Sequence, residues 1–320
     1  MVRLSNTNNN VFGIDFAPAI WNASGAWCMT PEELHDLGKS KSGAILIKST
    51  TKEPREGNLK PRYFETKLGS INSMGLPNLG PKVYCDLIPA LRAYGKPVMA
   101  SISGMKPEDN LPICTAYMDA GIDSLEINLS CPNIVGKPQV AFDFETSRKI
   151  LTEVKAISGK TPVGVKLPPY PDPIFNTQMA DIIKETKIDY VVCINSVPHT
   201  CIIDADSEEF AIKNKFGGLG GEYVKPVALG QVRRFYELLE GKIPVIGCGG
   251  ITNGRDALEH FLAGASAVQI GTQLMKETPL VFERIERELA QELQRKGVSL
   301  REVIGRAKPR ENQIEKMRNY

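Results

Sequence analysis

The chain has 320 residues, and its 39 basic and 37 acidic side chains leave a formal charge of +2 with no long block of one sign, which argues against a nucleic-acid groove. The first ten residues are polar, so we expect neither a signal peptide nor a membrane anchor. The charge balance therefore favours a small-molecule partner, and the N-terminus a cytoplasmic protein. Because the seven cysteines form no C-x-x-C pair and the three histidines no H-E-x-x-H pattern, we expect reduced thiols and no metal.

Short apolar runs typical of buried strands alternate with helical patterns along the chain. The expected strands are 16–21, 44–47, 98–102, 125–127, 162–165, 190–194, 243–246 and 267–270. The expected helices are 31–37, 83–93, 107–120, 144–157, 174–185, 227–239, 255–262 and 280–296. Eight alternations of strands apolar enough to be covered on both faces predict an α/β fold, a single (β/α)8 TIM barrel spanning 1–320; a doubly wound open sheet is the alternative.

Three local features refine this expectation. Thr30, Pro31 and Glu33 form the pattern of a capping box at the start of the first helix. The connections 49–80 and 196–224 are too long for plain loops, and since both follow strands we expect insertions that shape a pocket or lid at the C-terminal face of the barrel. The charged segment 309–320 is expected to be a loosely held tail.

Nearly every expected strand ends in a polar residue or a glycine. Gly249-Gly250 and Gly271-Thr272 follow the seventh and eighth strands, where barrels commonly bind phosphate, although Gly-Gly can also be a tight turn. Lys48 and Lys166 follow two other strands and would stabilise a ligand that becomes negative, as reduced flavin does; the alternative for each is a surface lysine.

Four asparagines and one thiol are further candidates for the same site. The four asparagines can read the edge of a cyclic imide or ureide, or can simply be turn residues; they are Asn72, Asn128, Asn133 and Asn195. Cys131 follows the apolar strand in Leu125-Glu-Ile-Asn-Leu-Ser-Cys-Pro-Asn133, and Pro132 ends that strand. A thiol on such a loop can act as a base if its pKa is lowered, whereas most free cysteines are small buried side chains.

Together these residues resemble the soluble, fumarate-linked (class 1A) dihydroorotate dehydrogenase family over about 22–302. The resemblance rests on Asn22-Ala-Ser-Gly25, Arg55-Glu-Gly-Asn58, Gly69-Ser-Ile-Asn-Ser-Met-Gly-Leu-Pro-Asn78, Asn128-Leu-Ser-Cys-Pro-Asn133 with Gly136-Lys-Pro-Gln139, Gly164-Val-Lys-Leu-Pro-Pro169, Phe216-Gly-Gly-Leu-Gly-Gly221 and Gly247-Cys-Gly-Gly250. It implies an FMN-binding (β/α)8 barrel, usually a homodimer, that oxidises dihydroorotate to orotate in pyrimidine biosynthesis with fumarate as electron acceptor.

The resemblance also implies roles for individual residues. Cys131 would be the general base at C5 of the substrate, while hydride leaves C6 for the flavin, and Lys48 would lie between substrate and flavin. The pyrimidine would be held by Asn72, Asn128, Asn133, Asn195 and Ser196, and its carboxylate by the backbone of Met74, Gly75 and Leu76. The flavin side would comprise Ala23, Ser24, Gly25, Lys48, Ser49, Asn128, Lys166, Ile194, Gly221, Cys248, Gly249, Gly250, Gly271 and Thr272.

Departures from the family pattern keep alternatives open. The segment Val197-Pro-His-Thr200 replaces the usual Ile-Gly-Asn-Gly, Ile134-Val135 the usual Val-Pro, and Pro171 a Phe. A different dihydropyrimidine or electron acceptor is therefore an alternative. Dihydrouridine synthases would need a basic RNA-binding surface, which this chain lacks. The NAD-linked class would need an iron–sulfur partner or domain, and this chain has no cysteine cluster; the quinone-linked class would need an amphipathic N-terminal extension, which we do not expect here. A catalytically silent flavin- or phosphate-binding barrel and a flavin-free isomerase are the alternatives from other classes.

Overall fold

The computed structural model describes residues 7–130 and 139–309, and its centre is an eight-stranded parallel sheet. The strands lie in the order β3-β16-β15-β10-β9-β8-β7-β4. Their bounds are β3 Ile20–Asn22, β4 Ile45–Thr50, β7 Val98–Ile102, β8 Ser124–Asn128, β9 Val163–Leu167, β10 Tyr190–Cys193, β15 Val245–Cys248 and β16 Ala265–Ile270. The strand order of a doubly wound sheet is absent from this arrangement, and the predicted (β/α)8 barrel is confirmed.

The side chain of Asn22 closes the barrel between the two ends of that order. Its Nδ2 donates to the carbonyl oxygen of Leu46 at 2.8 Å, and its Oδ1 accepts from the Leu46 amide at 3.0 Å. Asn22 is fully buried, and these two bonds, together with the backbone bond from the Gly43 amide to the carbonyl oxygen of Ile20 at 2.8 Å, link β3 to β4.

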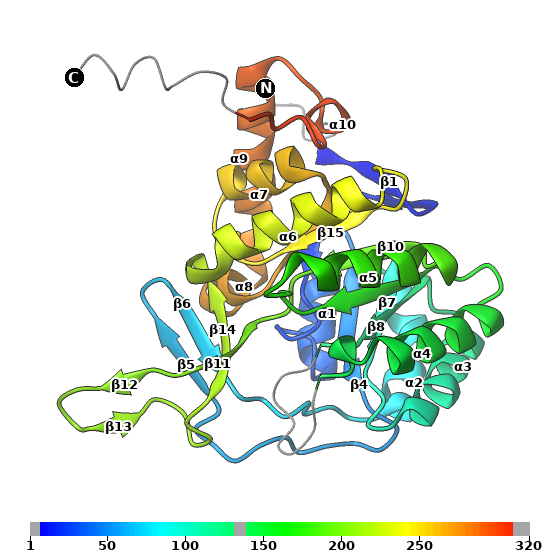
Figure 1. Ribbon diagram of the computed structural model, residues 1–320, viewed down its shortest axis with the longest axis vertical. Coiled ribbons are helices and arrows are strands. Elements are labelled where there is room, and N and C mark those ends of the chain that lie inside the picture. Colours follow the sequence, from blue (N-terminus) through cyan, green and yellow to red (C-terminus); the bar gives the residue numbers. More distant parts are fainter. Residues whose placement is uncertain (1–6, 131–138, 310–320) are drawn as a thin grey trace.

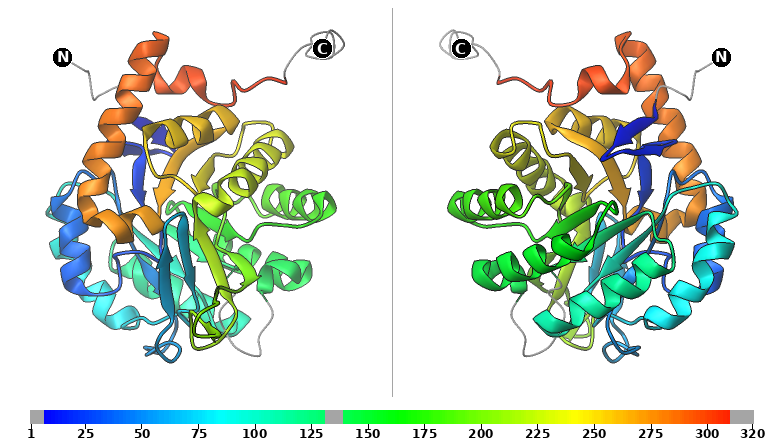
Figure 2. Two further views of the ribbon diagram at one scale, coloured as in Figure 1. Left: turned by 90° about the vertical axis from the view of Figure 1, so that its left-hand side faces the viewer. Right: turned by 90° about the vertical axis from the view of Figure 1, so that its right-hand side faces the viewer.

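Helices surround the strands, as Figures 1 and 2 show. They are α1 Pro31–Lys39, α2 Pro81–Arg92, α3 Asn110–Asp119, α4 Phe144–Ile157, α5 Pro173–Glu185, α6 Lys225–Leu238, α7 Gly254–Ala263, α8 Thr272–Glu277, α9 Val281–Lys296 and α10 Leu300–Val303. The capping box predicted at Thr30 is confirmed, since its hydroxyl accepts from the Glu33 amide at 3.3 Å and the Glu33 carboxylate accepts from the Thr30 amide at 3.2 Å. Such a cap stabilises a helix by ~1 kcal/mol.

The expected strand 16–21 is wrong in its bounds. That stretch is divided at Pro18, which cannot donate to a ladder, and only β3 belongs to the barrel. The residues before it form a hairpin of β1 (Asn9–Val11) and β2 (Ile14–Phe16). Phe12 in its turn stacks on Tyr190 of the barrel with ring centroids 4.1 Å apart, so the hairpin packs against the end of the barrel interior away from the strand C-termini.

The two long connections contain more order than the sequence predicts. They contribute β5 (Tyr63–Thr66), β6 (Gly69–Asn72), β11 (Val197–Thr200) and β14 (Gly217–Gly221), which pair as a four-stranded antiparallel sheet in the order β11-β14-β6-β5. We call this the roof sheet. A short hairpin of β12 (Ile203–Asp204) and β13 (Glu209–Phe210) projects from it (Figure 1).

Glycine is required where the two insertions meet in the roof sheet. A Cβ atom on Gly69 would lie 2.1 Å from the carbonyl oxygen of Gly220, and one on Gly217 would lie 2.5 Å from that of Asn72. No real side chain tolerates such contacts with a backbone oxygen. The run Gly217-Gly-Leu-Gly-Gly221 therefore forms a strand despite its poor intrinsic preference for one.

Candidate active site at the C-terminal face of the barrel

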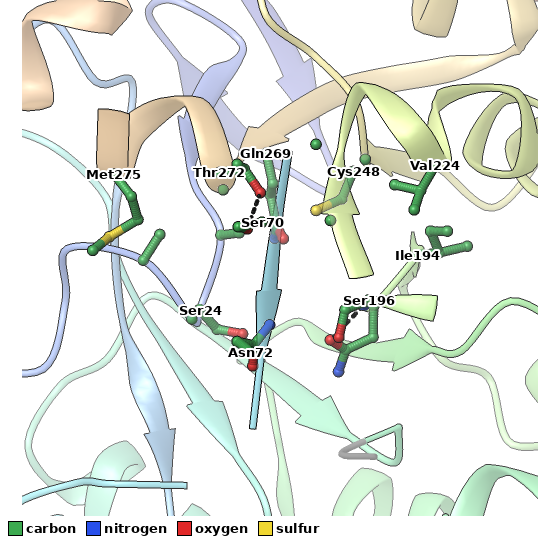
Figure 3. A pocket seen from close by; sticks show the side chains of 18 of the residues that line it. Ser24, Ser70, Asn72, Ile194, Ser196, Val224, Cys248, Gln269, Thr272 and Met275 are labelled. Atoms are coloured by element: carbon green, nitrogen blue, oxygen red, sulfur yellow. Dashed lines mark hydrogen bonds between the residues drawn. The ribbon is translucent and has the colours of Figure 1, made fainter. Parts of the chain in front are cut away.

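A cavity of about 330 Å³ lies between the C-terminal ends of the barrel strands and the roof sheet. Figure 3 shows Ser70 and Asn72 from the roof and Cys248 and Gln269 from the barrel pointing into the same space. Every predicted site residue that the structure describes lines this cavity: Ala23, Ser24, Gly25, Lys48, Ser49, Asn72, Met74, Gly75, Leu76, Asn128, Lys166, Ile194, Asn195, Ser196, Gly221, Cys248, Gly249, Gly250, Gly271 and Thr272. Cys131 and Asn133 lie outside the described residues.

Several lining residues were missed by sequence reasoning, namely Ala26, Tyr63, Ser70, Gly220, Val224, Ile251, Thr252, Gln269, Gln273 and Met275. Half of them belong to the roof sheet or to α8, whose positions depend on tertiary pairing. Gln269 is different, because it is a buried polar residue within the apolar strand β16. That local contrast is a signal the sequence does carry.

A buried cation forms part of the cavity wall on the barrel side. Lys166 of β9 is 3% exposed, and its Nζ donates to Oε1 of Gln269 at 2.7 Å and to Sγ of Cys248 at 3.5 Å. Burial opposes the charged form, but the negative field of the Cys248 sulfur and of Glu126 outweighs it, so the pKa of Lys166 lies above its usual value. The cavity therefore contains a fixed positive charge at neutral pH.

Lys48 supplies a second ammonium group from β4. It is 5% exposed, and its Nζ donates to the carbonyl oxygen of Ser24 at 3.3 Å. Ser24 is itself a lining residue on the loop that follows β3, so Lys48 ties this loop to the next strand of the barrel. An ammonium group carries three donors, so Lys48 can also donate to a ligand in the cavity.

Three polar side chains hold one another at the ends of β8 and β10. Asn128 donates from Nδ2 to the hydroxyl of Ser49 at 3.1 Å, and its Oδ1 accepts from the amide and hydroxyl of Ser130 at 3.2 and 3.0 Å. Asn195 donates from Nδ2 to the carbonyl oxygen and hydroxyl of Ser130 at 3.0 and 3.1 Å. These bonds fix which end of each amide faces which neighbour, and they make Ser130 a supporting residue that the sequence did not identify.

Glycines form a cradle at the ends of β15 and β16. Gly249 and Gly250 have φ of 131° and 74°, and a Cβ atom on Gly250 would lie 2.4 Å from Cβ of Lys225. Across the cavity, the Thr272 hydroxyl lies 3.1 Å from that of Ser70 (Figure 3). Backbone amides exposed at such a cradle suit an anion such as phosphate.

His260 supports this cradle from behind. It is fully buried in α7, and its Nε2 donates to the carbonyl oxygen of Gly249 at 3.0 Å. Burial lowers the pKa of His260 to about 4, so the ring is neutral at pH 7 and the proton lies on Nε2. This residue too was missed, because a lone histidine within a helix carries no sequence signal.

Most thiols in the described part of the chain are unsuited to acid–base chemistry. Burial raises the pKa of Cys28 and of Cys114 to about 12 and that of Cys85 to about 11, and it raises the pKa of Cys193 as well. These thiols remain protonated at neutral pH. Within the residues that the structure describes, no group of three metal-ligating side chains occurs, and no helix is long and apolar enough to cross a membrane.

Comparison with known proteins identifies relatives of the whole barrel. The family model described as "Dihydroorotate dehydrogenase" matches residues 6–293. The chain is 46% identical over 289 residues to "Dihydroorotate dehydrogenase A (fumarate)" of Lactococcus lactis subsp. lactis, covering 88% of this chain and 93% of that protein. It is 47% identical over 282 residues to "Dihydroorotate dehydrogenase (fumarate)" of Lachancea kluyveri, covering 86% and 90%.

Solved structures show the same fold at lower sequence identity. The structure of a protein named DHODH, in complex with ferulenol, from Eimeria tenella superposes with a TM-score of 0.79 at 24% identity. The match covers 94% of this chain and 88% of that one. At this identity the likeness supports the barrel alone.

Proposed function

Since the chain belongs to the dihydroorotate dehydrogenase family, we propose that it oxidises dihydroorotate to orotate in pyrimidine biosynthesis and passes the two electrons to fumarate. The observation that carries the proposal is the gathering of the two lysines, the asparagines and the glycine cradle in one cavity. The relatives named for fumarate, which match most of their length, support the acceptor.

FMN is the cofactor we propose for this cavity. The glycine cradle of Gly221, Gly249, Gly250 and Gly271 with Thr272 would receive the phosphate, and the ammonium of Lys166 would face the N1/O2 edge of the flavin. Ala23, Ser24, Gly25, Ser49, Asn128, Ile194 and Cys248 would complete the cofactor side. Bound FMN would accept a hydride from the substrate and return the electrons to the second substrate.

The substrate side of the cavity follows from the oriented amides. Asn72, Asn128 and Asn195 with Ser196 and Asn133 would hydrogen-bond the pyrimidine, and Lys48 would lie against both ligands. In the proposed reaction Cys131 takes the C5 proton as the C6 hydride departs, which leaves the C5–C6 double bond of orotate.

A rigid turn would hold the substrate carboxylate. Met74, Gly75 and Leu76 line the cavity, and Gly75 and Leu76 have φ of 72° and 56°. Arg55 fixes this turn by donating from Nε to the carbonyl oxygen of Gly75 at 3.2 Å. Successive amides in such a conformation form a concave anion site.

The position of the altered segment 197–200 is compatible with dihydroorotate as the substrate. Residues 197–200 form β11 at an edge of the roof sheet, and none of them is among the residues that line the cavity. Ser196, immediately before β11, does line it. The change at 197–200 thus alters the roof rather than the cavity wall.

Anaerobic flavin spectroscopy tests the proposal. Dihydroorotate should bleach the flavin absorbance of the purified protein, and fumarate should restore it. If dihydroorotate bleaches the flavin but only NAD or a soluble quinone restores the absorbance, fumarate is refuted as the acceptor, and the alternative of a different electron acceptor holds. No bleaching by dihydroorotate would refute the substrate, and a colourless protein that binds no added FMN would refute the flavin.

We also propose that the protein is a cytoplasmic homodimer, as the family resemblance implies. Large apolar side chains on or near the roof sheet are exposed and suit a protein contact: Phe64 (44%), Leu68 (42%), Phe216 (57%) and Tyr223 (45%). Light scattering at micromolar concentration would test it, and a mass of one chain would refute the dimer.

A further inference from the structure

A chain of three buried polar side chains runs from the cavity wall into the barrel interior. Glu126 of β8 and Gln269 of β16 are both fully buried inside the barrel. Nε2 of Gln269 donates to Oε2 of Glu126 at 2.6 Å, and Oε1 of Gln269 accepts from Nζ of Lys166 at 2.7 Å. Lys166 faces the cavity at the far end of this chain, whereas Glu126 does not line the cavity.

The direction of the Gln269 amide follows from its two neighbours. An ammonium group can only donate, so the amide oxygen must face Lys166. The NH₂ group then faces Glu126, which satisfies it as an acceptor. An apolar side chain at 126 would leave the NH₂ group without this acceptor and would free the amide to turn its donors toward Lys166, which repels them.

The buried carboxylate of Glu126 lowers the stability of the folded protein. Oε1 of Glu126 has no hydrogen-bond partner among the described residues, although it is completely buried. A buried polar atom without a partner costs ~1–3 kcal/mol, and more when charged. A residue that costs stability in the middle of a barrel is more readily explained by function than by packing.

The charge of Glu126 also acts on Lys166 through the barrel interior. It raises the pKa of Lys166, together with the Cys248 sulfur and against the effect of burial. Electrostatic interactions are strong in this water-poor space. Glu126 thus has two effects on the same ammonium group, one on its position and one on its protonation.

We propose that Glu126 is a positioning residue which, through Gln269, aims the Lys166 ammonium into the cavity and keeps it charged. This inference rests on the proposed function, because it requires that FMN is the ligand beside Lys166. A positive charge beside the N1/O2 edge stabilises reduced, anionic flavin, so Glu126 raises the midpoint potential of the flavin even though its own charge is negative.

The sign of the potential change separates this proposal from a simple charge effect. If Glu126 acted only as a nearby negative charge, removing it would raise the midpoint potential. If it acts by holding Lys166, Glu126→Leu should lower the midpoint potential of the flavin. At a fixed dye potential the ratio of reduced to oxidised flavin should then fall about tenfold, which corresponds to a midpoint potential lower by ~30 mV for a two-electron couple. FMN rebinding to the stripped protein should weaken by a similar factor, on the order of tenfold.

Two further variants complete the experiment. Glu126→Gln keeps an acceptor for Gln269 but loses the charge, so its midpoint potential should lie above that of Glu126→Leu. Ser124→Ala is the matched control, since Ser124 is buried on the same strand two residues earlier, and its hydroxyl lies 3.0 Å from that of Tyr190, away from Lys166. The control should leave the potential and FMN affinity unchanged.

Each outcome is decisive. A lowered potential in Glu126→Leu with an unchanged control supports the proposal, and a raised or unchanged potential overturns it. If Glu126→Leu does not fold, the test is the rate at which acetic anhydride acetylates Lys166, compared between the Glu126→Gln protein and the unchanged protein, both stripped of FMN. Loss of the Glu126 charge should lower the pKa of Lys166. Each pKa unit by which it falls should make acetylation at pH 9 about tenfold faster, because more of the amine is uncharged. An unchanged acetylation rate overturns the proposal.

The acetylation measurement also separates this inference from the proposed function. If dihydroorotate fails to bleach the flavin, dye titration of the bound flavin still reports the midpoint potential. If the protein binds no FMN at all, the proposed function fails, while the acetylation rate of Lys166 still tests the link to Glu126.

Discussion

Replacing Gly250 with alanine should damage the glycine cradle in a way that its backbone geometry makes predictable. Gly250 is buried with φ of 74°, and a new Cβ would lie 2.4 Å from Cβ, 2.7 Å from Cα and 2.9 Å from the amide nitrogen of Lys225. Two of these three atoms are backbone at the start of α6, so rotation of a side chain cannot relieve the contact.

The expected loss of stability is the sum of two effects. The left-handed backbone costs an L-residue ~1 kcal/mol relative to glycine. Overpacking against a fixed backbone adds ~1–3 kcal/mol. We therefore expect Gly250→Ala to lower the free energy of unfolding by about 2–4 kcal/mol and, because the cradle must shift, to weaken FMN binding.

Gly95 provides a matched control for the backbone effect. Its φ is 71°, it lies on the exposed connection between α2 and β7, and a Cβ there would meet nothing within 4 Å. Gly95→Ala should therefore cost only ~1 kcal/mol and leave FMN binding unchanged. Urea unfolding of both variants, with FMN titration of the stripped proteins, measures the difference; equal losses of stability would refute the steric argument.

Three other changes have expected outcomes that the structure specifies. His260 has its pKa lowered by burial to about 4, so between pH 6.5 and 4 the unfolded chain binds the extra proton; stability should fall by up to ~3 kcal/mol on acidification across this window, and His260→Gln should flatten the slope seen in urea unfolding at several pH values. An equal slope in the variant would contradict this account. Lys166→Met leaves Glu126 without its cation and should cost about 3 kcal/mol, part of which Glu126→Gln in the same chain should restore; an additive double variant would show that the two residues are not coupled. Cys131→Ala should leave FMN bound but slow flavin reduction by dihydroorotate roughly 10²–10⁴-fold in stopped-flow absorbance, and an unchanged rate would remove Cys131 from the mechanism.

The barrel was predictable because its strands carry their own signal. The run 98–102 and the helix 144–157 have the predicted bounds, and the other barrel strands and main helices differ mostly at their ends. The first strand failed because Pro18 interrupts an apolar stretch whose earlier part pairs as a separate hairpin. The composition of a single segment cannot distinguish a strand of the barrel from a strand of a hairpin that packs against the end of the barrel.

Strand-end patterns located the barrel side of the cavity, whereas residues of the two insertions such as Met74, Gly75 and Gly221 were assigned only through the family resemblance. Polar residues that end apolar strands meet at one edge of a parallel sheet, and that rule located Lys48, Lys166 and Asn128 together. The pairing of the roof was not predictable in the same way, because Gly217-Gly-Leu-Gly-Gly221 has low strand preference and pairs with β6 so closely that a Cβ at Gly217 would meet the Asn72 carbonyl oxygen.

Support residues were the hardest class to predict, and the reason is physical. Ser130 holds Asn195 through a hydrogen bond between residues 65 apart in the chain, and His260 of α7 holds the carbonyl oxygen of Gly249 from the helix that follows. Such a residue is chosen by its partner's position and not by the pattern around it. It follows that a change in one of these supports should alter ligand binding or pH dependence while leaving the cavity lining itself intact, which distinguishes supports from lining residues by experiment where sequence cannot.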